Sequence, residues 1–270
     1  MKPFNSYLII FLVFGSCASF SEINTLAIKS SESLQQYKTL EYNFTFNCSE
    51  TCYQRALEDK RFALAPPTCD CVEEKKTDKN VKRLFTVLDT YFKGLQRLSN
   101  DKLVNYSFDT MADPLTKGKF IEEKDIKPFL NLSQSIATMI TNKYRAKQLS
   151  TAIEKSNPDV LLLLEKLQQI IEENLVPTLT NKRGELQQVY LEIFSDSLNS
   201  NYDRFMIKDR YFKELNAVSK KESELLKYSK SLIKIAKGHQ LLYDNRYNFD
   251  KETTKNAIVE LYSELSEMIN

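Results

Sequence analysis

The chain has 270 residues, of which 42% are hydrophobic and 27% charged, and it contains five Gly, seven Pro and no Trp. This composition excludes collagen-like and low-complexity proteins and is typical of a globular protein. Thirty-eight basic and 36 acidic residues give a formal net charge of +2, so any polyanion site must be local. A single His excludes most metal sites and most His-dependent catalytic schemes.

Residues 1–19 have the organisation of a secretory signal peptide. Lys2 provides a basic start, an apolar run covers residues 7–14, and small residues follow at 15–19. The apolar run is too short to cross a hydrocarbon core of about 30 Å, and no later stretch approaches the roughly 20 residues that a transmembrane helix needs. We therefore expect a secreted, extracellular protein without a transmembrane segment. Acylation of Cys17, as in a lipoprotein, is the alternative.

The four remaining cysteines predict two disulfide bonds, because an even number in an exported chain favours pairing. Cys48 and Cys52 are four residues apart and share one face of a helix, and two consecutive prolines then end that helix and turn the chain. We expect the nested pairing Cys48–Cys71 and Cys52–Cys69, in which each bridge closes a loop of about 20 residues. A zinc site built from the four thiolates is the alternative, although the Cys-x-Cys spacing and export both disfavour it.

Four sequons for N-glycosylation lie in the first half of the chain, at Asn43, Asn47, Asn105 and Asn131. None follows residue 133, so glycans would cover one half of the protein and leave the other bare. We expect two of the four to be occupied in a eukaryotic host. The alternative is chance occurrence in a chain rich in Asn, Ser and Thr, and a bridged Cys48 would hinder modification of Asn47.

Helices are predicted throughout the chain that follows the cysteines. From residue 77 onward apolar residues recur at intervals of three and four, most clearly over 81–98, which indicates amphipathic helices. The run Asn157-Pro158-Asp159 predicts the start of a helix and Pro177 its end. A break is expected at 199–201, and Asp250 is expected to cap the last helix.

The predicted fold class is all-α, because no alternating run is long enough to build a sheet. We expect an elongated helical bundle with an N-terminal disulfide-stapled helical hairpin. A weaker stretch at 109–127 places a boundary near residue 120. It would divide the mature chain into a disulfide-containing N-terminal helical region, 20–120, and a C-terminal helical bundle, 121–270. The protein is expected to be a monomer or a weak dimer.

No motif predicts catalysis, a cofactor or a metal site. His239 would have to be the base of a serine hydrolase, but the chain has no Gly-x-Ser-x-Gly turn and no second His. Its glycines are isolated and form no phosphate-binding loop. Because His239 continues an apolar stripe with a seven-residue period, we expect a packed histidine, or one that faces the helix dipole, and not a ligand or base.

One local concentration of charge lies between residues 204 and 237, where ten residues are basic and four are acidic. Its lysines recur mainly every seven residues and define what we call the lysine ridge: Lys213, Lys220, Lys227, Lys230, Lys234 and Lys237. Such a ridge predicts binding of an anionic polymer such as a heparin-like glycan, anionic phospholipid or nucleic acid. The alternative is an ordinary solvated face that the acidic last helix partly neutralises.

Two classes of function remain. The first is a secreted, non-enzymatic binding or effector protein that engages an extracellular protein or glycan of a host or matrix. The second is a carrier of a small apolar ligand, such as a lipid, in a cavity lined by some of the 16 Phe and 14 Tyr residues. We favour the first, because the same residues also fill a helical core. In its overall profile the chain resembles secreted factors of invertebrates, for example salivary or excretory-secretory proteins, although no residue motif carries this likeness.

Overall fold

The computed structural model describes residues 20–58, 65–100, 114–141 and 145–269. Its helices are α1 Ser21–Gln35, the 3-10 turn η1 Gln36–Thr39, α2 Phe44–Glu58, α3 Val72–Ser99, α4 Glu123–Thr141, α5 Arg145–Gln169, the π-helical segment η2 Ile170–Leu175, α6 Val176–Phe194, α7 Asn201–Asp244 and α8 Glu252–Ile269. Within these ranges the structure has no strand beyond one isolated bridge between Gly118 and Ile121. The all-α prediction is confirmed. The signal peptide predicted at 1–19 and the sequon at Asn105 lie outside the described residues.

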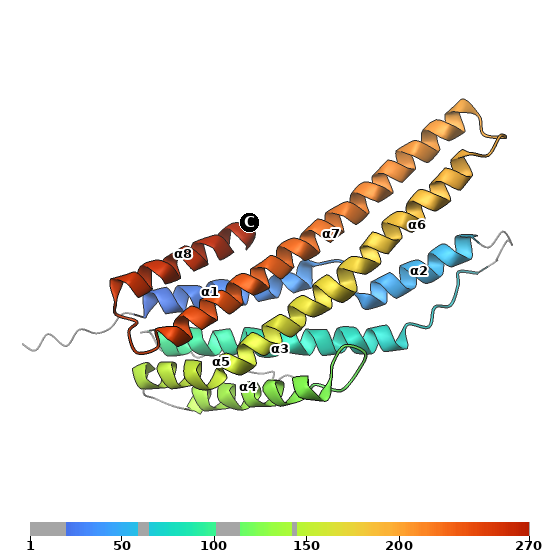
Figure 1. Ribbon diagram of the computed structural model, residues 1–270. Helices are drawn as coiled ribbons and strands as arrows, with labels where there is room; N and C mark the ends of the chain where they lie inside the picture. Colours follow the sequence, from blue (N-terminus) through green and yellow to red (C-terminus); the bar gives the residue numbers. More distant parts are fainter. Residues whose placement is uncertain (1–19, 59–64, 101–113, 142–144, 270) are drawn as a thin grey trace, which may run out of the picture.

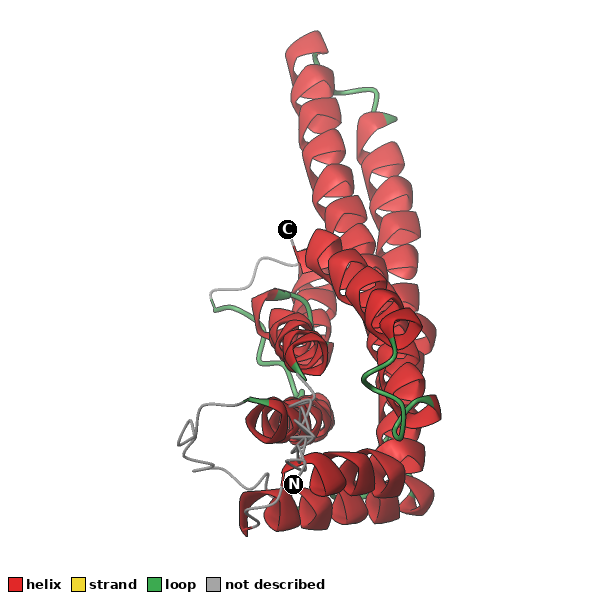
Figure 2. Cartoon of the chain, turned by 90° about the vertical axis from the view of Figure 1, so that its left-hand side faces the viewer, coloured by secondary structure: helices red, strands yellow, loops and turns green. Residues whose placement is uncertain are grey.

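The molecule is an elongated bundle from which two helices project (Figure 1). The bundle contains the C-terminal part of α7 together with α1, α3, α4, α5 and α8. The C-terminal end of α6 and the N-terminal end of α7 extend beyond this bundle as an antiparallel pair. Figure 2, turned by 90°, shows the same two helices extending beyond the rest. The elongated shape is therefore produced mainly by one long helical hairpin.

A single hydrophobic core runs through the described chain, from Ile23 in α1 to Leu265 in α8. The amphipathic stripe predicted at 81–98 forms one side of α3, where Tyr91 and Phe92 are among the largest fully buried side chains. This core contains residues from both sides of position 120. The domain boundary expected there stays a prediction.

The helix start predicted at Asn157 is wrong, because α5 begins at Arg145 and continues through Pro158. Leu149 and Ile153, before the proline, are fully buried, so the apolar stripe is already established when the chain reaches Pro158. Asn157 acts not as a cap but as a buried hydrogen-bonding partner of other side chains. Burial on both sides of the proline thus outweighs the local signal for a helix start.

The helix end predicted at Pro177 is also corrected. Helical backbone passes from α5 through η2 into α6, and Pro177 lies in the first turn of α6, directly after the π-helical segment. The break at 199–201 is confirmed, with Ser200 as the N-cap of α7 in a capping box with Asp203. The last helix begins at Glu252, so Asp250 lies one residue too early to cap it.

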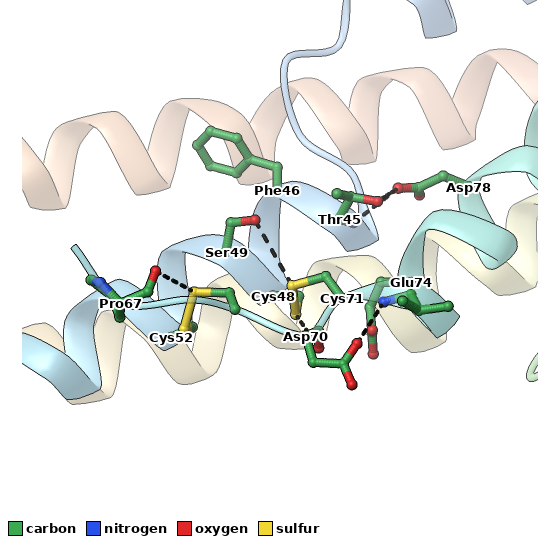
Figure 3. The surroundings of a disulfide bond; sticks show 12 residues. Thr45, Phe46, Cys48, Ser49, Cys52, Pro67, Asp70, Cys71, Glu74 and Asp78 are labelled. Atoms are coloured by element: carbon green, nitrogen blue, oxygen red, sulfur yellow. Dashed lines mark hydrogen bonds between the residues drawn. A yellow bond between two sulfur atoms is a disulfide. The ribbon is translucent and has the colours of Figure 1, made fainter. Parts of the chain in front are cut away.

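The nested disulfide pairing is confirmed: Cys48 bonds to Cys71 and Cys52 to Cys69, each pair with Cα atoms 5.9 Å apart. Figure 3 shows both bridges joining α2 to the extended segment that precedes α3. Because all four sulfurs are paired, the alternative of a four-thiolate zinc site is excluded. The bridges close the predicted N-terminal helical hairpin, α2 with α3.

Candidate functional site

His239, the single histidine of the chain, is packed inside the bundle. Its side chain is only 1% exposed, and its Nε2 lies 2.7 Å from the Tyr91 hydroxyl and its Nδ1 2.8 Å from Oδ1 of Asn157. Burial lowers the pKa of His239 to about 3, so the ring is neutral at physiological pH. The neutral ring links α7 to Tyr91 of α3 and Asn157 of α5, and it is buried where a substrate in solvent cannot reach it.

No metal centre is found in the part of the chain that the structure describes, where no group of three or more His, Cys, Asp and Glu side chains is placed to hold an ion. None of the described helices is long and apolar enough to span a bilayer.

The three described sequons lie at partly exposed positions on α4 and at the start of α2. Asn43 accepts a hydrogen bond from Phe46 N through Oδ1, and Asn47 accepts one from the Tyr42 hydroxyl through Oδ1. A glycan is attached to Nδ2, the other amide atom, so these contacts are compatible with modification. Asn131 donates a long hydrogen bond of 3.4 Å from Nδ2 to Asp159. Glycosylation stays a prediction at each of these positions.

The lysine ridge lies along α7, and part of it is paired with acids. Lys213 Nζ lies 2.6 Å from Asp209, and Lys220 Nζ lies 3.8 Å from Glu224, both within the same helix at a spacing of four. Both lysines remain exposed to solvent. Such exposed pairs are weak, so these two ammonium groups are still accessible to an external anion.

In the C-terminal part of the lysine ridge, one lysine contacts α8 and the others face solvent. Lys234 forms an ion pair with Glu264 of α8 and is half-buried, whereas Lys227, Lys230 and Lys237 are exposed. The described residues place no acid within ion-pair distance of these three lysines. The acidic last helix thus neutralises one position of the ridge and leaves its middle open.

An open groove of about 450 Å³ separates the same part of α7 from α8. Its lining is mixed: Lys234, Lys237, Gln240, Leu241, Asp244, Ala257, Glu260, Leu261 and Glu264. Charged groups of both signs surround a small apolar floor, and the groove opens to solvent. This groove lacks the enclosed apolar lining that a carrier of a lipid needs.

Sequence reasoning missed an apolar surface at the projecting end of α6 and α7. Of the fourteen large apolar side chains that are strongly exposed in the described chain, seven lie within residues 191–212. They are Leu191, Ile193, Leu198, Tyr202, Phe205, Met206 and Phe212. A signal was present: this segment contains more apolar residues than one stripe between two helices can bury. Grouped exposure of this kind marks an interaction site in a soluble protein.

Comparison with protein-family models, with curated proteins and with solved structures gives no match to this chain.

Proposed function

We propose that this protein is a secreted, non-catalytic binding protein that engages an anionic extracellular polymer, such as a sulfated glycan, through the lysine ridge. The observation that carries the proposal is the open row of Lys227, Lys230 and Lys237 on α7. Ten residues at 1.5 Å rise separate the first from the last, which is about 15 Å and spans several charges of an extended polyanion. The two disulfides support export to an oxidising compartment.

The backbone under these lysines is held in place. Leu225, Leu232 and Ile235 of α7 are buried in the core, and α7 packs most extensively against α5 and α6. Lys227, Lys230 and Lys237 therefore stand on a helix that does not have to order on binding. A prepositioned row of cations loses less conformational entropy when a polyanion binds than a flexible basic tail does.

Retention on a heparin column tests the proposal. We expect the double variant Lys227→Glu, Lys230→Glu to elute at clearly lower salt than the unmodified protein, because each contact releases counterions. The slope of log affinity against log salt should fall by about two, one for each lysine. The melting temperature should not change, because exposed charges contribute little to stability.

The matched control is Lys75→Glu, Lys82→Glu on α3, which reverses two exposed lysines and changes the net charge equally. It should elute close to the unmodified protein. Equal shifts in both variants would mean that only net charge matters. That result, or no retention at physiological salt, would leave the lysine ridge as an ordinary solvated face.

A further inference from the structure

The outer end of the hairpin made by α6 and α7 carries side chains that the bundle does not explain. We call residues 191–213 the hairpin end; it lies beyond the other helices in both views (Figures 1 and 2). Leu198, in the turn, is 90% exposed, and Leu191, Phe205 and Phe212 are 63%, 67% and 55% exposed. Large apolar side chains left in water at this density indicate a surface that something else covers.

Several of these side chains face the same way. Phe205, Lys208 and Phe212 are spaced by three and four residues, so they share one flank of α7. Lys208 Nζ stands 5.0 Å from the centroid of the Phe194 ring on α6, which places this flank on the same side as that ring. Leu191 precedes Phe194 by three residues and shares its flank on α6. Together these five residues form what we call the docking face.

The docking face is cationic at its centre. Arg204 also stands over the Phe194 ring, at 5.8 Å from its centroid, next to Lys208. Four nearby acids are engaged in local contacts: Asp196 with the backbone N of Leu198, Asp203 with Ser200, Asp209 with Lys213, and Glu214 with Tyr190 and Arg210. The fifth, Glu192, is exposed and lies two residues before Phe194, so it is on the other side of α6. Arg204 and Lys208 are thus left to interact with the aromatic ring and with an external anion.

We propose that the docking face binds the surface of an anionic phospholipid bilayer. Leu, Phe and basic side chains on one face are the combination by which helices bind in the interfacial layer, about 5–10 Å deep, while the cations reach the headgroup phosphates. Projection beyond the bundle lets the hairpin end meet a flat surface. A second copy is the weaker occupant, because it would bring Arg204 and Lys208 of two chains face to face. The inference uses residues outside the lysine ridge and goes beyond the proposed function, so the heparin experiment does not decide it.

The test uses the mature protein and vesicles of phosphatidylcholine, with and without phosphatidylserine. The protein should float with the vesicles that contain phosphatidylserine. Because the chain has no Trp, the variant Phe205→Trp provides a single reporter at the docking face. Its emission should shift to shorter wavelength when these vesicles are added. Tyr53→Trp, at an exposed position of α2, should show no shift, and soluble glycerophosphoserine should leave both unchanged because it offers no acyl layer.

Two double variants separate the apolar from the charged contribution. Phe205→Ser, Phe212→Ser should lower vesicle binding about tenfold or more, whereas Tyr53→Ser, Tyr247→Ser, which removes two exposed rings elsewhere, should not. Arg204→Gln, Lys208→Gln should remove the preference for phosphatidylserine. The proposal is overturned if the unmodified protein does not float, or if the Phe variant floats equally well. A reporter shift with the soluble headgroup, or a dimer that the Phe variant dissociates, would also overturn it.

Discussion

At the scale of single residues, the polar cluster around His239 joins three helices through the middle of the core. Asn157 of α5 donates from Nδ2 to Gln240, so its Oδ1 accepts from Nδ1 of His239. Nε2 is then the acceptor for the hydroxyl of Tyr91 on α3. One neutral tautomer satisfies both contacts, which explains how an imidazole is accommodated at a fully buried position.

Acidification should destabilise the protein through this residue. The pKa of His239 is about 3 in the fold against 6.5 for an ordinary histidine, so below pH 6.5 the unfolded chain binds a proton that the folded chain does not. The stabilisation that this pKa difference provides is fully present above pH 6.5 and is lost as the pH falls toward 3. Between pH 7 and pH 5 the loss is about 2 kcal/mol, measurable by urea denaturation at the two pH values.

The matched variant is His239→Gln, which removes the single imidazole of the chain. Its free energy of unfolding should change much less between pH 7 and pH 5 than that of the unmodified protein. An equal drop in both proteins would show that other groups, and not His239, produce the pH dependence.

At the scale of elements, α2 is held by its first turn and by the two disulfide bonds more than by burial in the core. Among its described side chains only Phe44, in the first turn, is buried. Asp78 of α3 caps that turn by accepting hydrogen bonds from the backbone N atoms of Phe44 and Thr45, at 3.0 and 2.9 Å. Further along, the two bridges are what join α2 to the segment before α3 (Figure 3).

Replacing all four bridged cysteines by serine should release the C-terminal half of α2 and leave the bundle folded. Each bridge closes a loop whose entropy contributes about 3 kcal/mol, and little burial replaces it. Hydrogen exchange should accelerate in residues 48–56 and stay slow in α3 beyond residue 80, where the side chains are buried. Slow exchange throughout α2 in this variant, or loss of protection in α3, would contradict the prediction.

The π-helical segment η2 connects the bundle to the hairpin without interrupting the helix. Ile170, Ile171 and Leu175 are buried there, and Glu172 accepts a hydrogen bond of 2.6 Å from Ser229 of α7. A π turn adds one residue to a helical turn and so rotates the residues that follow. On both sides of η2 the chain packs against α7, first through α5 and then through α6.

At the scale of the whole molecule, the core and the hairpin end contribute separately to stability. Few of the side chains that form the core come from α6 beyond Leu186 or from α7 before Val218. The rings of Tyr190 and Tyr211 pack against each other in a tilted arrangement between the two helices at this end, with centroids 5.5 Å apart. The hairpin end is therefore stabilised mainly by its own two helices.

Shortening the hairpin should accordingly spare the bundle. A variant in which a short Gly-containing loop replaces residues 191–212 should melt within about 4 °C of the unmodified protein, since 1 kcal/mol shifts the midpoint of a chain of this size by roughly that amount. Thermal circular dichroism measures it. A much lower midpoint would show that the hairpin end supports the core.

The sequence alone determined the features that depend on neighbouring positions. The period of apolar residues identified the helix containing Tyr91 and Phe92, the turn residues identified the break at 199–201, and chain order at the cysteines identified the nested bridges. Local spacing is sufficient for these, because side chains three or four residues apart share a helical face whatever packs against it.

Only the tertiary structure decided what each face meets. It carried α5 through Pro158, surrounded His239 with Tyr91 and Asn157, and paired Lys234 of the lysine ridge with Glu264 of α8. It also left Phe205 and Phe212 exposed, although the same residue type is buried elsewhere in the chain. Burial is a property of two elements that meet, and residues far apart in sequence determine which elements do so.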